Sequence, residues 1–160
     1  MRRSMRVLVA YESRGGTTRR TGEAIAEAAR GAGHAVTVGP LADVAPAEVG
    51  AFDAVFVGAW IEGFILFGVR PARAAIEWVR RLPPLEGKPV AVFCTYAFNP
   101  RGSLGVLTAA LEDKGARVVD GHAFHRRDPE AGVEGFVVRA LAAAGPEGPG
   151  SATTGGPEPR

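Results

Sequence analysis

The stretch VLVAYESRGGTTRRTGEAIAEAAR, residues 7 to 30, joins two kinds of pattern. Its first part, Val7 to Tyr11, is almost continuously apolar, which is typical of a strand covered on both faces of a parallel sheet. From Thr18 to Arg30, small and apolar residues return at helical spacing while charged residues point the other way. Serine, glycine and threonine residues fill the junction. The stretch therefore predicts a strand that turns directly into a helix.

After this first strand and helix, the alternation of predicted strands and helices continues along the chain. Four more apolar runs predict strands at Ala35 to Val38, Ala54 to Gly58, Val90 to Tyr96, and Arg117 to Ala123. Further helices are predicted at Arg70 to Leu82, with Pro71 in the first turn, at Leu104 to Gly115, and at Pro129 to Ala143. Residues 41 to 50 hold at most about two helical turns. Strict alternation predicts a three-layer α/β/α sandwich whose five-stranded parallel sheet has the order 2-1-3-4-5.

The composition fits one globular domain. The 160 residues are 46% hydrophobic and 22% charged, and the alternating pattern covers residues 5 to 143. Residues 1 to 4 are predicted to be a flexible extension, and residues 144 to 160, rich in glycine and proline, a disordered tail. No apolar run reaches the roughly 20 residues that span a bilayer, and no secretory signal pattern is present. The sequence therefore predicts a cytoplasmic protein without a membrane partner.

Charge and reactive side chains argue against several classes of function. The formal net charge is +2 and the arginines are dispersed, which argues against nucleic acid and would suit an acidic redox partner. The pairs at residues 19–20, 80–81 and 126–127 are assigned to solvated faces. Cys94 lies in an apolar run and is interpreted as a buried, inert thiol. His122, His125 and Asp128 are spaced like metal ligands, but nothing completes such a site, so no metal is predicted.

In an open parallel sheet, ligands bind beyond the carboxyl ends of the strands, where the strand order reverses. Here that position corresponds to the loops after the first, third and fourth strands. The first loop, Ser13 to Thr18, offers three hydroxyls and two glycines, and its backbone amides suit an anion such as a phosphate. It lacks the lysine of the nucleoside-triphosphate P-loop. From these residues alone, a glycine turn with a threonine cap is an equally good interpretation.

Aromatic residues mark the other two loops. Trp60 lies two residues after the predicted end of the third strand, and Tyr96 ends the fourth strand. Two rings at these places suit the walls of a slot for a flat ligand. Thr95, Asn99 and the backbone around Ala97 suit hydrogen bonds to a polar ring edge. Taken singly, Tyr96 is also explained as a half-buried tyrosine at a strand end.

Three segments together resemble flavodoxins. The segment VLVAYESRGGTTRRTGEAIAEAAR resembles the amino-terminal part of the family, with its first loop. The segment DAVFVGAWIEGF resembles the second, flavin-flanking loop, and PVAVFCTYAF resembles the third loop. The resemblance covers residues 5 to 143 and implies a flavodoxin-like fold with FMN bound noncovalently between the three loops. The cofactor-binding residues that it implies are Ser13, Arg14, Gly15, Gly16, Thr17, Thr18, Ala59, Trp60, Ile61, Thr95, Tyr96, Ala97 and Asn99.

Two features depart from this family. Gly15 stands where the family usually has threonine, which removes one hydroxyl contact and predicts weaker FMN binding. The chain is also basic, whereas electron-carrying flavodoxins are typically acidic. It lacks the long insertion of the larger flavodoxins and therefore resembles the short-chain group.

The resemblance implies an electron-transfer protein with a redox partner protein, working as a monomer or a dimer. The flavin does the chemistry, so no nucleophile or general base of the protein is required. Two alternatives stay open from the sequence. One is an FMN-dependent oxidoreductase acting on a quinone or a porphyrin precursor. The other is a cofactor-free interaction module of the same fold.

Overall fold

The computed structural model describes residues 3–62, 70–100 and 102–145, with the backbone alone for residues 62 and 70. From residue 146 onward the predicted tail lies outside the described residues, as do residues 1 and 2 of the predicted extension.

Five parallel strands form the central sheet: β1 (Arg6–Glu12), β2 (Ala35–Pro40), β3 (Ala54–Glu62), β5 (Pro89–Tyr96) and β6 (Arg117–His125). Their order in space is β2-β1-β3-β5-β6, which confirms the predicted order 2-1-3-4-5. A two-residue strand, β4 (Arg70–Pro71), pairs antiparallel with the end of β3. From β1 the chain first adds β2 on one side and then β3, β5 and β6 on the other. The strand order therefore reverses between β1 and β3.

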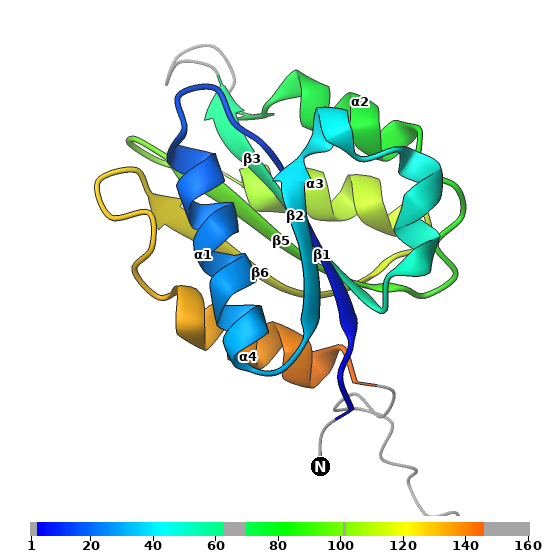
Figure 1. Ribbon diagram of the computed structural model, residues 1–160. Coiled ribbons are helices and arrows are strands. Elements are labelled where there is room, and N and C mark those ends of the chain that lie inside the picture. Colours follow the sequence, from blue (N-terminus) through cyan, green and yellow to red (C-terminus); the bar gives the residue numbers. More distant parts are fainter. Residues whose placement is uncertain (1–2, 63–69, 101, 146–160) are drawn as a thin grey trace, which may run out of the picture.

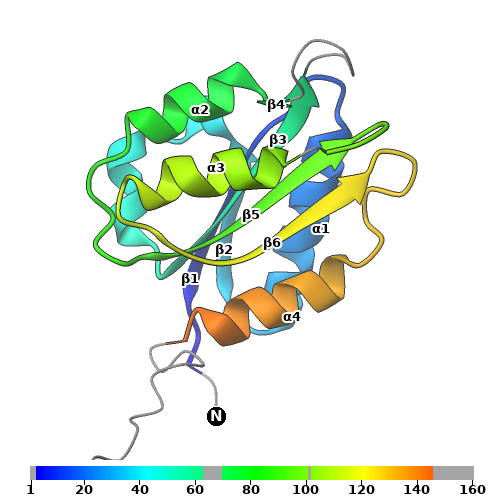
Figure 2. The same cartoon turned by 180° about the vertical axis from the view of Figure 1, so that it is seen from behind.

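Helices cover both faces of this sheet, as Figure 1 and Figure 2 show from opposite sides. On one face α1 (Thr17–Gly31) lies beside α4 (Val133–Ala143), and on the other α2 (Arg73–Arg80) lies beside α3 (Ser103–Glu112). The predicted three-layer sandwich is therefore confirmed. Two short 3₁₀ helices, Leu41–Asp43 and Pro46–Ala51, occupy most of the segment expected to hold at most two helical turns.

Successive side chains of a strand belong to two separate cores. Leu8 of β1 packs in the core that contains Trp78 of α2. Its neighbour Val9 packs in the other core, with Ile25 of α1 and Phe136 of α4. Leu8 and Val9 are both fully buried. Burial on both faces explains why the strand sequence is almost unbroken in its apolar character.

The third strand is longer than predicted. It was expected to end at Gly58, but β3 continues to Glu62. Trp60 pairs with Thr95 of β5, so the neighbouring strand supplies hydrogen-bond partners beyond the apolar run. The prediction that Trp60 lies in a loop was therefore wrong, because strand length here depends on a neighbour distant in sequence.

The start of the second helix also differs from the prediction. Pro71 was expected in the first helical turn, but it pairs with Ile61 as part of β4, and α2 begins at Arg73. The amide of Ala72 donates a hydrogen bond to the carbonyl of Trp60 at 2.9 Å, which keeps the segment extended. Proline is compatible with a strand edge as well as with a first helical turn, so its presence did not separate the two.

The last helix begins later than Pro129, where its start was predicted. The chain leaves β6 through a turn in which the amide of Asp128 donates to the carbonyl of His125 at 3.0 Å. Gly132 then adopts a left-handed conformation, with φ of 87°, directly before Val133, the first residue of α4. Residues 129 to 132 therefore belong to a loop at the carboxyl edge of the sheet.

Candidate functional site

The carboxyl ends of β1, β3 and β5 meet at one edge of the sheet. Glu12 at the end of β1 lies opposite Ala59 of β3, and the next residue, Trp60, lies opposite Thr95 of β5. This register places the start of the first predicted loop, the tryptophan and the start of the third loop next to one another.

A pocket of about 450 Å³ opens at this edge. It is lined by Arg14, Gly15, Thr17, Thr18, Trp60, Ile61, Thr95, Tyr96, Ala97 and Arg126. Nine of these ten residues belong to the predicted set, so the structure brings most of that set together. Ser13, Gly16, Ala59 and Asn99 do not line the pocket; Ala59 is fully buried and Asn99 is exposed.

The first loop is held by its own serine. Ser13 Oγ accepts a hydrogen bond from the amide of Gly16 at 3.1 Å. Gly16 has φ of 90°, a left-handed conformation that favours glycine, and it directly precedes α1. No side chain caps the start of α1, so the amides of its first turn keep their capacity to bind an anion. Ser13 therefore shapes the loop that leads into the uncapped start of α1.

One threonine of this loop is already engaged within the protein. The hydroxyls of Thr18 and Thr95 lie 2.7 Å apart and share a hydrogen bond, although the two residues are 77 positions apart in sequence. Both are almost completely buried, at 1% and 4% exposure. The bond ties the start of α1 to the end of β5 and so connects two of the three loops.

Two aromatic rings flank the pocket from neighbouring strands. The guanidinium carbon of Arg14 lies 5.5 Å from the ring centroid of Trp60, a cation–π contact between the first loop and β3. Tyr96 packs edge-on against His125 of β6, with ring centroids 5.1 Å apart. Each ring is only partly buried and is held by a neighbour from another element. Both rings line the same pocket, one from β3 and the other from β5.

Arg126 lines the pocket but was assigned from the sequence only to a solvated face. Its amide donates to the carbonyl of Tyr96 at 2.9 Å, which continues the β5–β6 pairing by one residue. One feature could have indicated that Arg126 reaches the pocket. It directly follows the last strand, β6, which pairs with β5. With Arg14 on the opposite side, the lining residues carry two guanidinium groups and no carboxylate.

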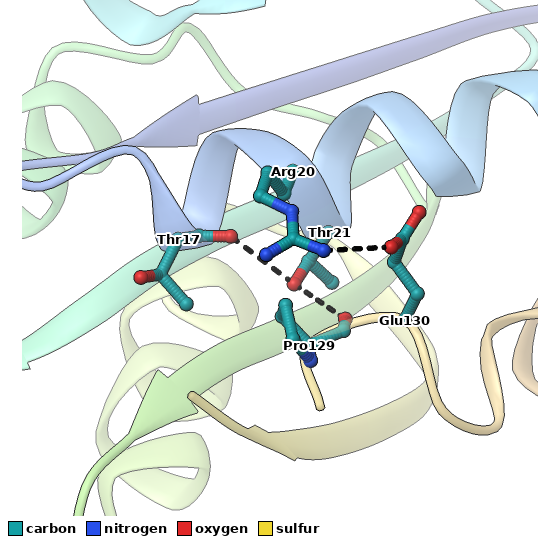
Figure 3. Close-up of polar contacts among 5 residues, drawn as sticks. All are labelled: Thr17, Arg20, Thr21, Pro129 and Glu130. Carbon is teal, nitrogen blue, oxygen red and sulfur yellow. Dashed lines mark hydrogen bonds and ion pairs between the residues drawn. The ribbon is translucent and has the colours of Figure 1, made fainter. Parts of the chain in front are cut away.

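The loop after β6 is fixed to α1, as Figure 3 shows. Thr21 Oγ1 donates to the carbonyl of Pro129 at 2.7 Å, and Thr21 is completely buried. Beside it, Arg20 forms an ion pair with Glu130 at 3.0 Å on the surface. A surface pair of this kind contributes little, roughly 0–1 kcal/mol, so the buried threonine is the stronger tether. The tether holds the loop that begins with Arg126 against the helix that begins at the pocket.

The remaining sequence candidates have structural roles. The expected burial of Cys94 is confirmed, and burial raises the pKa of its thiol to about 12, which favours the protonated form near neutral pH. His122 packs against Phe124 and Phe136. Burial, and then the nearby Arg139, lower the pKa of His122. Within residues 3–62, 70–100 and 102–145, no three His, Cys, Asp or Glu side chains gather where they could hold a metal ion.

Two larger hollows lie away from the carboxyl ends of the strands. One, of about 920 Å³, runs between α1 and α4, and the other, of about 690 Å³, lies near the amino ends of the strands. Their linings contain no aromatic ring other than His34, and the first includes four carboxylates: Glu23, Glu27, Glu130 and Glu134. Size alone would favour them, but the smaller pocket combines free amides, aromatic walls and guanidinium groups. We therefore take the smaller pocket as the functional site.

In the described part of the chain, no helix has the length and apolar character needed to cross a membrane.

Comparison with known proteins was made by sequence and by structure. The family model described as "Flavodoxin domain" matches residues 8–119. No curated protein matches the chain. Among solved structures, a two-electron reduced flavodoxin from Megasphaera elsdenii is 24% identical, with a TM-score of 0.74 over 86% of this chain and 98% of that one.

Two further solved structures give the same result. Flavodoxin 2 from Bacillus cereus is 19% identical, with a TM-score of 0.71 over 85% of this chain and 97% of that one. A flavodoxin from Streptococcus pneumonia is 18% identical, with a TM-score of 0.70 over 86% of this chain and 98% of that one. At these identities the likeness shows that the fold is shared.

Proposed function

The chain belongs to the flavodoxin domain family, and on this premise we propose that it is a short-chain flavodoxin-like electron carrier whose FMN occupies the 450 Å³ pocket. FMN is the cofactor that the family implies, and electron transfer is the role that it supports. The observation that carries the placement is the convergence of the three predicted loops on one pocket at the point where strand order reverses.

The residues of the pocket fit FMN. Its volume lies within the range of about 300–1,000 Å³ that is usual for small-molecule sites. The uncapped start of α1 offers amides to a phosphate, and the first turn of α1 contains no acidic residue. A Cβ added at Gly15 would meet no atom within 4 Å, so the loop leaves open space next to these amides. Arg14 and Arg126 add positive charge where an anion has to be accommodated.

Each part of the pocket has its own role in the proposal. The amides of residues 15 to 18 and the hydroxyl of Thr17 hold the phosphate, with Ser13 and Gly16 fixing the loop. Trp60 and Tyr96 flank the flavin ring. The backbone around Ala59, Ile61 and Ala97, together with Asn99, supplies polar contacts to the ring edge. Thr18 and Thr95 hold the two sides together through their mutual hydrogen bond.

Bound FMN supplies the electron-accepting and electron-donating chemistry. The chain stacks aromatic rings against the cofactor, orients it through the phosphate and shields part of it from water. No nucleophile or general base of the chain is required. The protein influences the flavin only through the residues that surround the ring. The partner is a second redox protein, and the proposal places the carrier in the cytoplasm, with no nucleic acid or membrane among its partners.

The test is a titration of the purified full chain with FMN and with riboflavin, followed by flavin and tryptophan fluorescence. We expect FMN to bind at least about tenfold more tightly than riboflavin, because riboflavin lacks the phosphate. Trp60→Ala should weaken FMN binding by about tenfold through lost stacking. Phe98→Ala is the matched control, because Phe98 does not line the pocket. A chain that ignores added FMN would overturn the proposal.

A second measurement separates a carrier from a turnover enzyme. The FMN-loaded chain is mixed with a nicotinamide donor and a quinone, and donor consumption is followed over time. A carrier should show a single reduction event, whereas sustained consumption would identify an oxidoreductase instead.

A further inference from the structure

A cationic surface with one apolar ring borders the pocket. We call it the rim and define it by Arg14, Phe98, Arg126 and Arg127. Phe98 follows Ala97, which lines the pocket, and Arg127 follows Arg126, which also lines it. Phe98 is 83% exposed, the most exposed of the large hydrophobic side chains that the structure describes. The rim therefore lies at the mouth of the site, on loops from three different strands.

The positive charge of the rim is not neutralised by the protein. Five arginines elsewhere in the described residues form ion pairs with carboxylates: Arg19–Glu23, Arg20–Glu130, Arg30–Glu27, Arg73–Glu77 and Arg139–Asp120. Considering only the described residues, none of the three rim arginines forms such an ion pair. Arg14 instead contacts the ring of Trp60. With FMN bound, its phosphate offsets part of the charge of Arg14 and Arg126, and Arg127 adds a cation that the proposed phosphate site does not use. Uncompensated charges of one sign create a local field that attracts oppositely charged molecules.

Hydrogen bonds hold the backbone of the two rim arginines that follow β6. The amide of Arg126 donates to the carbonyl of Tyr96, and the amide of Arg127 donates to His125 Nδ1 at 3.1 Å. At its other end the same loop is tied to α1 by the hydrogen bond between Thr21 and Pro129 that Figure 3 shows. A surface whose backbone is already ordered loses less conformational entropy when a partner binds.

The exposed phenylalanine gives the rim an apolar contact. Removing an exposed aromatic side chain from water is favourable, so a partner that covers Phe98 would gain affinity from the contact. Aromatic and arginine side chains are the types enriched in protein–protein interfaces, whereas lysine and glutamate are depleted there. The combination of one aromatic ring and three arginines therefore fits a protein partner.

We propose that the rim is the docking surface for an acidic electron-transfer protein. This inference rests on the proposed function, because docking at the rim brings the partner to the mouth of the FMN pocket. Opposite charges guide the encounter and orient the partner, and Phe98 supplies the apolar contact at its centre. One exposed ring offers a single stacking platform, so a protein partner fits better than a nucleic acid strand, which needs successive platforms.

The experiment measures binding to the FMN-loaded full chain by calorimetry and by amide NMR shifts. The probes are a plant-type ferredoxin of net negative charge, a cytochrome c of net positive charge, and a single-stranded oligo(dT). We expect the ferredoxin to bind most tightly, with shifts at the rim, and to lose about tenfold or more in affinity between low and high salt. None of these readings depends on electron transfer.

Substitutions then locate the surface. Arg127→Glu should weaken ferredoxin binding by about tenfold, and Arg127→Gln by less, because charge reversal adds repulsion to the lost attraction. Arg81→Glu is the matched control: it makes the same change in net charge at the exposed end of α2 and should change affinity less than about twofold. Phe98→Ala should weaken binding by about tenfold at both salt concentrations, since its contribution is apolar.

The outcomes separate this inference from the proposed function. The flavin spectrum decides whether FMN is bound, and a chain without FMN overturns both. With FMN bound, two results would overturn the proposed docking surface and leave the proposed function intact. One is tighter binding of the cytochrome c than of the ferredoxin. The other is an equal loss of ferredoxin affinity in Arg127→Glu and Arg81→Glu. Tighter binding of oligo(dT) than of ferredoxin would identify a nucleic-acid surface and overturn it as well.

Discussion

The first and the last helix begin with the same backbone geometry but in different surroundings. Gly16 precedes α1 with φ of 90°, and Gly132 precedes α4 with φ of 87°. Neither helix start has a side-chain cap. The first turn of α1 contains no acidic residue, whereas that of α4 contains Glu134. The two starts therefore offer similar amides but opposite local charge.

The surroundings of the two helix starts differ in the properties that favour a bound anion. The α1 start lies where strand order reverses and lines a pocket together with Arg14 and Arg126. The α4 start lies beside the edge strand β6, and a Cβ at Gly132 would meet His122 Nε2 at 3.6 Å. The starts of α1 and α4 share the glycine geometry. Their position in the sheet and the charge of neighbouring side chains distinguish the start proposed to bind an anion from the other.

The largest expected effect comes from making the charge of α1 resemble that of α4. Thr17→Glu places a carboxylate in the first turn of α1, next to the proposed phosphate position. Repulsion between close charges near a protein surface amounts to a few kcal/mol, so FMN affinity should fall about 100-fold. Fluorescence titration measures the loss, and thermal unfolding should show a fold as stable as before, because the carboxylate is favourable to the helix dipole.

The reciprocal change is the control. Glu134→Gln removes the carboxylate at α4 and should leave FMN affinity unchanged within about twofold, since α4 begins away from the pocket. Equal losses in the two variants would show that the difference in charge between the helix starts is unrelated to FMN.

Replacing the two glycines breaks the shared geometry. Gly16→Val and Gly132→Val each force a β-branched residue into the left-handed region, at a cost of roughly 1–3 kcal/mol of folding stability. Chemical denaturation should show similar losses for both. Only Gly16→Val should also weaken FMN binding, because Gly16 lies between two lining residues, Gly15 and Thr17, whereas Gly132 does not line the pocket. FMN affinity that falls equally in both variants would contradict the assignment of the α1 loop.

A smaller effect is expected from the hydrogen bond that ties α1 to β5. Thr18→Val removes one hydroxyl and leaves that of Thr95 buried without its partner, which should cost about 1–3 kcal/mol of stability. The double variant with Thr95→Val removes both hydroxyls, so its loss should be smaller than the sum of the single losses. Urea denaturation of the four proteins provides the test, and additive losses would show that the bond contributes nothing.

The smallest expected effect is a gain. Gly15→Thr adds a hydroxyl where the cradle lacks one, and the new Cβ meets open space without a positive φ. We expect FMN to bind a few-fold more tightly, in line with a hydrogen bond to a charged group of about 1 kcal/mol or more. Gly50→Thr, also into open space but on the second 3₁₀ helix, is the matched control. An unchanged affinity for Gly15→Thr would argue that this position does not face the phosphate.

Much of the fold could be predicted because it is encoded locally. The unbroken apolar run from Val7 to Tyr11 reflects burial on both faces, and the helical pattern after it reflects one face packed on the sheet. Strict alternation then leaves few topologies, and the observed strand order is among them. The same logic pointed to the three loops that meet at the pocket.

The remaining features depend on neighbours distant in sequence. Trp60 lies in a strand because β5 supplies its partner, and Arg126 reaches the pocket because β6 pairs with β5. The hydrogen bond between Thr18 and Thr95 depends on the packing of α1 against the strand ends. Such contacts follow from register and packing, which no local pattern of residue types expresses. That is why the walls of the pocket were expected but the arginine beside Tyr96 was not.

During synthesis on a ribosome, the two halves of the pocket are made at different times. β1, β2, β3 and α1 all lie within the first 62 residues, so this half of the sheet can pair before β5 has been synthesised. Thr95 and Arg126 emerge much later, and the first of them closes the pocket by its bond to Thr18. A nascent chain therefore carries the glycine loop and Trp60 early, but it gains the complete pocket only after Thr95 and Arg126 have been synthesised.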